Sequence, residues 1–372
     1  MAGIGHADLD ALVGADKSAC DTPALIVDLD VMEANIARIA RACRDNRIAW
    51  RPHVKGIKVP AIAHMLQAAG ASGITCAKLG EAEAMADAGI GDILIANQIV
   101  GPQKIARLMA LRRRADVIVA VDDPDNVAAL AQAARQAGVK LRVVIETQIG
   151  IRRAGVLPGE SVLAFARMIA KHDGLAFSGV MGWEGHAAPM IDPQQKMDAV
   201  AAAVRDLVHS AELCRAVDLA ASIVSCGGTG TYWLSAAQPG VTEIQAGGGI
   251  FGDVHYRTHF GVYHAYALRV MTIVTSRPNP NRLVCDAGKK AMSGDVALPL
   301  PVGLEGLRLV RLSAEHVTVE LDSPAVMPRV GDRLEFIVGY SDTTVHLHDR
   351  MHGVRNGRIE VVWPILGRDT LR

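Results

Sequence analysis

The chain of 372 residues has no excess of either charge, few aromatic residues and no long hydrophobic run. Its 39 basic and 39 acidic residues cancel, so no global electrostatic attraction to nucleic acid is expected. Aromatic residues make up only 4% of the chain, which argues against a stacking platform for single strands. No apolar run approaches the ~20 residues that span a bilayer, which excludes a transmembrane protein. We therefore expect neither a nucleic-acid nor a membrane partner.

The N-terminus and the cysteines exclude two further classes. The first residues carry Asp8, Asp10 and Asp16 and lack a basic stretch followed by an apolar one, so no secretory signal is expected. None of the 6 cysteines stands in a CxxC pair, which excludes a zinc knuckle and a small disulfide framework. Reduced cysteines in a cytoplasmic protein are the simplest interpretation.

What the sequence does contain is a regular alternation of short apolar runs with alanine-rich helical stretches. Such alternation indicates βαβ units around a parallel sheet. Eight strands within about 200 residues match the arithmetic of a TIM-like (β/α)8 barrel. The alternative, a doubly wound open sheet, would open with GxGxxG, which is absent after the first strand. The expected strands are 48–55, 73–77, 92–97, 117–121, 141–147, 177–182, 222–226 and 242–246.

From about residue 262 the pattern changes to β-rich runs separated by turns. The Asn-Gly pair at 356–357 lies between two such runs and predicts a hairpin. Residues 23–30 also resemble a strand and are expected to pair with this second, mostly β domain. The predicted fold is thus α/β, with a barrel over residues 31–258 and a β domain built from 1–30 and 259–372. The expected β runs are 265–276, 282–286, 317–321, 333–338, 343–348 and 357–363.

Glycine-rich turns follow the last two predicted barrel strands, at 227–230 and 247–249. Working residues of such barrels lie at the C-terminal ends of the strands, and phosphate often binds after strands seven and eight. Glycines there expose backbone N–H groups that form an anion cradle. Each turn taken alone is equally explained by the need for a tight bend. Together they predict a phosphate site.

Lys55 ends the first predicted strand, close to the same barrel mouth. A desolvated lysine there can form a Schiff base with an aldehyde cofactor, although a solvated strand-end lysine is the ordinary alternative. Pyridoxal phosphate requires both a phosphate site and a lysine, so the pattern predicts this cofactor. A sugar-phosphate barrel enzyme that uses Lys55 as a simple base stays open, and would show no visible cofactor absorbance.

Several motifs resemble those of the fold-type III pyridoxal-phosphate enzymes. The closer resemblance is to the D-threonine aldolase and D-serine dehydratase branch, in the same order along most of the chain. The motifs are RPHVK (51–55), GxxRxGV (150–156), GGTGTY (227–232), EIQAGGG (243–249), VCDAGKKAMS (284–293), AEHV (314–317) and HLHDRMHGVRNGRIEVVWPILGR (346–368). The resemblance implies a pyridoxal-phosphate-dependent lyase that cleaves D-β-hydroxy-α-amino acids to glycine, or another small amino acid, and an aldehyde.

The resemblance leaves the reaction open among several possibilities. A dehydratase of D-serine or D-3-hydroxyaspartate and an amino-acid racemase are alternatives, because the broken bond depends on side chains that the sequence does not place. A non-catalytic pyridoxal-phosphate-binding protein is a further alternative, although the extra β domain favours catalysis. The resemblance also implies a homodimer in which the β domain of one subunit reaches the active site of the other. The expected partner is a small amino-acid substrate.

The resemblance implies a role for each matching residue. Lys55 matches the Schiff-base lysine, His53 a histidine that lines the cofactor, and Arg153 the arginine that meets its phenolic oxygen. Trp183 stands where the family has a tyrosine near the pyridine ring. The phosphate-binding positions are Gly228, Thr229, Gly230, Gly248 and Gly249.

The catalytic base is the first departure from the family pattern. The aldolases carry a basic histidine at the position that matches Pro189. We expect His186 to replace it, since a neutral imidazole suits removal of a hydroxyl proton near neutral pH. Alternatively, His186 simply forms a hydrogen bond within its loop.

The metal site is the second departure. Metal-activated members use a His-x-Asp or His-x-Cys pair, and the matching stretch here reads Tyr340-Ser341-Asp342. His346 and His348 alternate on a predicted strand, so Asp342, His346 and His348 are candidate ligands for a divalent cation such as Mn, Mg or Zn. Structural histidines held by hydrogen bonds would give the same pattern.

Overall fold

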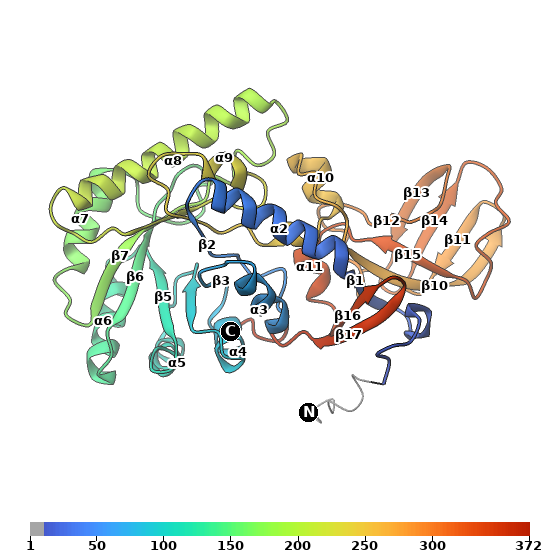
Figure 1. The fold of residues 1–372 in the computed structure, drawn as a ribbon, viewed down its shortest axis with the longest axis horizontal. Helices are drawn as coiled ribbons and strands as arrows, with labels where there is room; N and C mark the ends of the chain where they lie inside the picture. Colours follow the sequence, from blue (N-terminus) through green and yellow to red (C-terminus); the bar gives the residue numbers. More distant parts are fainter. Residues whose placement is uncertain (1–10) are drawn as a thin grey trace.

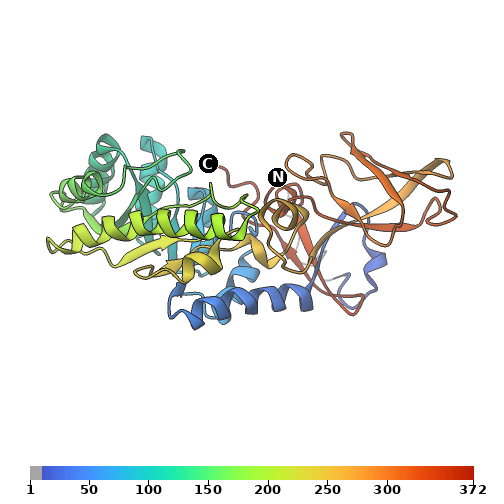
Figure 2. The same ribbon diagram turned by 90° about the horizontal axis from the view of Figure 1, so that it is seen from above.

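Two lobes lie side by side along the long axis of the molecule (Figure 1; Figure 2). This computed structural model describes residues 11–372. Asp8 and Asp10, and with them the predicted lack of a secretory signal, lie outside the described residues. One lobe is a barrel of strands and helices, and the other is a β-sheet domain, with helix α10 (Val254–Phe260) between them in Figure 1.

Eight parallel strands form the barrel, in the order β2-β9-β8-β7-β6-β5-β4-β3. A bridge between His53 and Thr75 joins the two ends of this sheet, where the Val54 N–H donates to the Thr75 carbonyl at 2.8 Å. The predicted barrel is therefore confirmed, with a strand in each expected run. The strands are β2 (Ala49–Trp50), β3 (Ile74–Cys76), β4 (Asp92–Ile95), β5 (Asp116–Val121), β6 (Leu141–Glu146), β7 (Leu175–Met181), β8 (Ile223–Cys226) and β9 (Glu243–Ile244).

Helices cover the outside of the barrel, and their first residues show why they begin where they do. Asp28, Asp123 and Asp192 each accept a hydrogen bond from a backbone N–H in the first turn of α2, α6 and α8. Proline is the first residue of α3 and α5, a position where the missing N–H removes no hydrogen bond within the helix. The helices are α2 (Leu29–Asp45), α3 (Pro60–Ala68), α4 (Leu79–Asp87), α5 (Pro102–Arg112), α6 (Pro124–Ala137), α7 (Glu160–Ile169), α8 (Pro193–Arg215) and α9 (Tyr232–Ala236).

A buried arginine ties three barrel strands together near their ends. Arg51 lies 3.0 Å from a carboxylate oxygen of Glu243 and 2.7 Å from one of Asp92. Gly73 leaves the space for it, because a Cβ there would lie 2.5 Å from an Arg51 guanidinium nitrogen. Strand β2 ends at Trp50, but backbone hydrogen bonds to the β9 segment continue beyond it, because the Arg51 N–H donates to the Ile244 carbonyl at 2.9 Å and the His53 N–H donates to the Gln245 carbonyl at 2.8 Å.

The second lobe is a nine-stranded sheet in which seven strands follow the order β13-β14-β11-β10-β1-β16-β17. Of the other two strands, β15 pairs with β10, and β12 pairs with β15. Its strand β1 pairs antiparallel with β10 and parallel with β16, as expected for residues 23–30. Asn356 and Gly357 have φ of 51° and 76° and connect β16 to β17, so the predicted hairpin is confirmed. The strands are β1 (Ala24–Asp28), β10 (Leu268–Asn279), β11 (Arg282–Cys285), β12 (Leu300–Pro301), β13 (Leu307–Leu312), β14 (Val317–Leu321), β15 (Arg333–Ile337), β16 (Arg350–Arg355) and β17 (Arg358–Pro364).

One expected strand is wrong. Residues 343–348 do not form a strand, and helix α11 (Ser341–Val345) occupies the first half of that run. Its β-branched residues favour a strand locally, but the Ser341 N–H and Oγ both donate to Asp253 Oδ2 at 2.8 Å and fix the first turn. The domain boundaries at 31–258 and at 1–30 with 259–372 stay a prediction.

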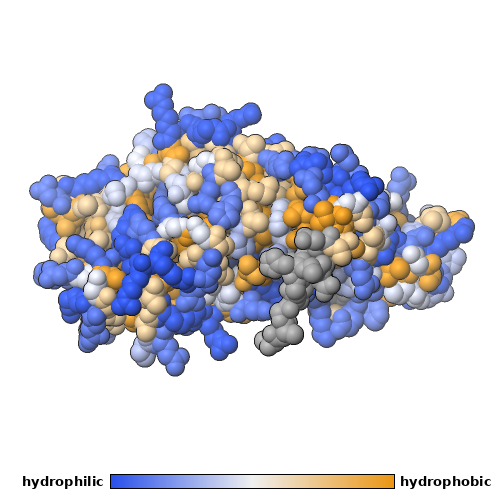
Figure 3. Space-filling view, turned by 60° about the horizontal axis from the view of Figure 1, so that its bottom comes forward, coloured by the Kyte–Doolittle hydropathy of each residue, from blue (hydrophilic) through white to orange (hydrophobic). Residues whose placement is uncertain are grey.

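On the face shown in Figure 3, hydrophobic residues are interspersed with hydrophilic ones, and the largest orange group lies right of centre. Within residues 11–372, none of the helices has the length and apolar character needed to cross a membrane.

Candidate active site

A cavity of about 380 Å³ opens at the C-terminal ends of the barrel strands, where the sequence predicts the site. Its lining brings together most of the predicted site residues, which come from the ends of five different strands. Those that line it are His53, Lys55, Arg153, Trp183, Gly228, Thr229, Gly230 and Gly248. The other predicted residues are not part of the lining: Asp342, Gly249, His186, His346 and His348. Of these, Asp342 contacts Lys55, which does line the cavity.

The two glycine turns present bare backbone to this cavity. A Cβ at Gly228 would lie 2.7 Å from Trp183 Nε1, and one at Gly248 would lie 2.6 Å from the Tyr256 hydroxyl. A side chain is therefore sterically excluded at Gly228 and at Gly248. A short 3-10 helix, η2 (Gly248–Ile250), begins at the second turn, so backbone N–H groups are oriented as in an anion site.

A buried carboxylate fixes the first glycine turn. Glu184 is 0% exposed and accepts hydrogen bonds from Thr231 Oγ1 at 2.5 Å, Ser235 Oγ at 2.6 Å and the Gly227 N–H at 3.3 Å. Sequence reasoning noted the stretch after the sixth strand but not this residue. The available signal was a glutamate directly before a turn.

Hydrogen bonds also fix the second turn. The Gly249 N–H donates to Thr229 Oγ1 at 3.1 Å, and its carbonyl accepts from His264 Nδ1 at 2.7 Å. His264 Nε2 in turn lies 3.0 Å from the Tyr232 hydroxyl, which sets the tautomer of the ring. Gly249 therefore connects the two turns instead of facing the cavity.

Lys55 lies at the mouth of the cavity, with its side chain 45% exposed. Its Nζ is 3.3 Å from Asp342 Oδ2, and its backbone N–H lies 3.4 Å from His53 Nδ1. Burial, reinforced by the charge of Lys55, holds the pKa of His53 below its ordinary value, so the ring is neutral. A second lysine shortly after this motif, Lys58, is instead buried, and its Nζ lies 3.2 Å from Glu81 Oε1, away from the cavity.

Arg153 provides the second cation of the cavity. Its guanidinium lies 5.6 Å from the centre of the Trp183 ring and 3.7 Å from Glu146 Oε1. Burial raises the pKa of Glu146, while a hydrogen bond of 2.6 Å from Gln98 opposes that shift. Sequence reasoning missed both Glu146, at the end of β6, and Gln98, after β4, which are brought together across the intervening strand β5.

The donor set of this cavity fits pyridoxal phosphate. The glycine turns offer backbone N–H groups to a phosphate, Lys55 offers an amine, and Trp183 and His53 offer ring faces or edges to a pyridine ring. The cavity volume of about 380 Å³ falls within the range of small-ligand sites.

His186 does not face the cavity. Its ring packs on Gly150, where a Cβ would lie 2.0 Å from His186 Nδ1. The Glu184 carboxylate accepts a hydrogen bond from the Gly227 N–H in the first glycine turn. The backbone turn that begins at Glu184 then places His186 against the loop that contains Gly150. A role for His186 as the base therefore stays a prediction without direct access to the cavity.

The predicted cation ligands do not converge. His346 follows helix α11, and His348 Nε2 donates to the Ala291 carbonyl at 2.8 Å. Across the part of the chain that the structure describes, no group of three or more His, Cys, Asp or Glu side chains is arranged to hold a metal ion. The alternation on which His346 and His348 were predicted required a strand, and that strand is wrong. Asp342 was predicted from its match to the His-x-Asp pair, and it shares a hollow with His346 but not with His348.

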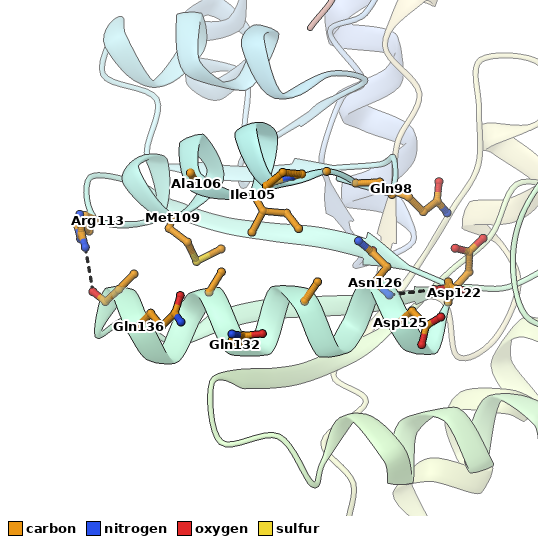
Figure 4. A pocket seen from close by; sticks show the side chains of 17 residues that line it. Gln98, Ile105, Ala106, Met109, Arg113, Asp122, Asp125, Asn126, Gln132 and Gln136 are labelled. Carbon is orange, nitrogen blue, oxygen red and sulfur yellow. Dashed lines mark hydrogen bonds between the residues drawn. The ribbon is translucent and has the colours of Figure 1, made fainter.

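A larger groove of about 820 Å³ lies between α5 and α6 (Figure 4). It shares Gln98 with the cavity, and is otherwise lined mainly by alanine, glutamine and aliphatic side chains. Asp122 at one end of the groove accepts a hydrogen bond of 2.9 Å from the Gly155 N–H, and so holds the loop that carries Arg153. The groove itself brings together no nucleophile with a phosphate cradle.

Comparisons with known proteins agree with this geometry. The family model of the alanine racemase N-terminal domain matches residues 27–255, and that of a putative serine dehydratase domain matches residues 267–354. The 3-hydroxy-D-aspartate aldolase of Paracoccus denitrificans (strain Pd 1222) is 36% identical over 98% of this chain and 96% of its own. The chain belongs to the D-threonine aldolase-like branch of the fold-type III enzymes.

Solved structures of this branch have the same architecture. The D-threonine aldolase from Filomicrobium marinum superposes with a TM-score of 0.94 at 33% identity, over 98% of this chain and 100% of that one. The D-threo-3-hydroxyaspartate dehydratase from Delftia sp. HT23 has a TM-score of 0.85 at 29% identity, over 93% of this chain and 97% of that one. A variant of that dehydratase has been solved in a metal-free form.

Proposed function

We propose that this protein is a pyridoxal-phosphate-dependent lyase of D-β-hydroxy-α-amino acids, and that it cleaves them as an aldolase. One observation carries the proposal: Lys55 and two glycine turns, which leave no room for a Cβ at Gly228 or Gly248, line a single cavity at the barrel mouth. Relatives named 3-hydroxy-D-aspartate aldolase and D-threonine aldolase, similar over nearly the whole chain, support the aldolase reaction.

The chain would hold the cofactor at three points. The backbone N–H groups at Gly228 and Gly248 would bind the phosphate, Lys55 would provide the amine for attachment, and Arg153 would provide a cation for the ring oxygen. When bound, pyridoxal phosphate supplies an electron sink for the bond that breaks at Cα. Trp183, fixed between Arg153 and Gly228, sets one wall against which the ring would stack.

The remaining residues orient the substrate and limit water. Tyr256, Phe260 and Tyr340 line the cavity beside Lys55, so a side chain at Cβ meets an aromatic wall. His53, held neutral by burial, adds no second positive charge beside the Lys55 amine. His186 is retained as a candidate base, to be tested by substitution.

We further propose a homodimer in the cytoplasm. The Lys55 and Arg153 side chains are 45% and 59% exposed, and a second subunit over the barrel mouth would remove them from water. The cytoplasm is supported by 6 cysteines that are all free and buried. Sedimentation of the purified protein tests the dimer.

The cofactor is tested by visible absorbance and by reduction with borohydride. We expect a coloured protein in which reduction fixes the cofactor to Lys55, detected as a modified peptide by mass spectrometry. Lys55→Ala should lose the adduct, whereas the exposed Lys171→Ala should keep it. Retained colour in Lys55→Ala, or an adduct on another lysine, contradicts the assignment.

The reaction is tested with D-threonine, D-serine, D-3-hydroxyaspartate and D-alanine. An aldehyde with glycine or another small amino acid identifies an aldolase, and ammonia with a keto acid identifies a dehydratase. Inversion without a change in mass identifies a racemase. His186→Ala, if it keeps the cofactor but loses all products, supports that base, while unchanged turnover removes it.

A further inference from the structure

The segment from Tyr340 to Asp342 is fixed rigidly beside the cavity. Asp253, which is 1% exposed, accepts two hydrogen bonds from Ser341 and one of 2.7 Å from the Tyr256 N–H. Tyr340 packs its ring edge-on against His255, with ring centres 5.1 Å apart, and lines the cavity. The side chains on either side of Ser341 therefore have a defined position relative to Lys55.

Asp342 connects Tyr340 to Lys55. The Tyr340 hydroxyl donates to Asp342 Oδ2 at 2.9 Å, and the same oxygen lies 3.3 Å from Lys55 Nζ. The other oxygen, Oδ1, is buried and has no hydrogen-bond partner within residues 11–372. Gly56 makes room for it, because a Cβ at that position would lie 2.1 Å from Asp342 Oδ1. The Asp342 carboxylate therefore has a fixed position beside the Lys55 amine.

The donor set at this place does not suit a divalent cation. The Tyr340 hydroxyl donates a hydrogen bond to Asp342 Oδ2 at 2.9 Å, so it already serves as a donor to the carboxylate. A phenol hydroxyl used in this way offers no ligand comparable to imidazole. His348 is already bonded to the Ala291 carbonyl. His346 has a buried Nδ1 without a hydrogen-bond partner and lines the same hollow as Asp342, but the two side chains belong to no group of three or more metal-ligating residues within residues 11–372.

We propose that Tyr340 and Asp342 form a cation-independent clamp on Lys55, in place of the metal site that the resemblance implies. The Tyr340 hydroxyl fixes the Asp342 carboxylate, and the carboxylate fixes the position and charge of the Lys55 amine. Both are positioning residues. The importance of Lys55 rests on the proposed function, whereas the absence of a cation rests on Tyr340 and Asp342 alone.

The cation is tested without any substrate. Mn²⁺ is titrated into chelator-treated holoenzyme, and free Mn²⁺ is measured by electron paramagnetic resonance. We expect no stoichiometric binding by the wild type and one equivalent in Tyr340→His, which creates a His-x-Asp pair. The double variant Tyr340→His with Asp342→Asn should lose that equivalent. A wild-type site that Asp342→Asn abolishes overturns the proposal, and so does a Tyr340→His variant that binds none.

The clamp is tested with Tyr340→Phe, which keeps the ring and removes the hydroxyl. We expect a shifted absorbance maximum of the bound cofactor, and kcat lowered about 10-fold with little change in KM. Added Mn²⁺ should not restore activity. Tyr263→Phe, which removes a hydroxyl from a side chain in a 72% exposed residue, is the matched control.

A purely structural role of Tyr340 would lower the melting temperature and leave the absorbance maximum in place, which would overturn the clamp. A wild-type spectrum and kcat in Tyr340→Phe would do the same. Because the Mn²⁺ titration and the spectrum require no turnover, they remain decisive even if the aldolase assay fails.

Discussion

Replacing Glu184 by glutamine tests whether one buried carboxylate holds the phosphate turn. Its Oε1 accepts from the Thr231 and Ser235 hydroxyls, and its Oε2 from the Gly227 N–H. In Glu184→Gln, the remaining amide oxygen can still accept hydrogen bonds from the Thr231 and Ser235 hydroxyls, but these bonds are weaker because the acceptor is no longer charged. The amide NH₂ group then faces the Gly227 N–H, so that hydrogen bond is lost. At roughly 1 kcal/mol for each weakened bond and somewhat more for the lost one, the change costs about 3 kcal/mol.

The assay is denaturant unfolding of the holoenzyme, combined with a cofactor titration of the apoprotein. We expect a lower unfolding midpoint and a Kd for pyridoxal phosphate raised by about 10-fold or more, since 1.4 kcal/mol at the turn already gives that factor. Glu212→Gln, on the exposed face of α8, is the control and should change neither quantity. Wild-type affinity and stability in Glu184→Gln would refute the view that this carboxylate holds the turn.

Three further predictions concern buried charge and thiols. Lys58→Met leaves Glu81 without its buried partner and should cost about 3–5 kcal/mol of unfolding free energy, which Lys58→Met with Glu81→Leu should largely restore; an additive double variant contradicts the pairing. Burial raises the pKa of Asp253 to about 7, so the folded protein keeps a proton that the unfolded chain releases. Stability should therefore fall as the pH rises from about 4 to about 7, by up to about 4 kcal/mol, and Asp253→Asn should flatten that slope in pH-dependent unfolding. Burial also raises the pKa of Cys43 to about 12 and of Cys285 to about 11, so Ellman's reagent should label the native protein slowly and the denatured protein at once; rapid native labelling would contradict the buried, free state.

The sequence predicts the barrel and the phosphate site because their signals are local. Strand and helix periods recur in short windows, and the glycines at 227–230 must follow a strand to form the turn. Lys55 was predicted for the same reason, as the polar end of an apolar run. In contrast, the ion pair between Lys55 and Asp342 joins distant parts of the chain, and no window of sequence contains both.

Tertiary contacts explain what sequence reasoning missed. The run 343–348 has strand-like residues, yet Asp253 from the end of the barrel segment caps it as the helix α11. That single contact removes the alternation on which the predicted cation ligands depended. Glu184 was also missed, because a glutamate after a strand is usually solvated, and the sequence does not show that the Thr231 and Ser235 hydroxyls at α9 donate to it.

The position of β1 has a consequence for how the protein is made. This strand is hydrogen-bonded on one side to β10 and on the other to β16, so it belongs to a sheet whose remaining strands all follow the barrel. During synthesis, Ala24–Asp28 has no strand to pair with on either edge until β10 and β16 have also been synthesised. A chain shortened before residue 350 would therefore leave the earliest strand without its parallel partner, and the two lobes would depend on each other to reach the native state.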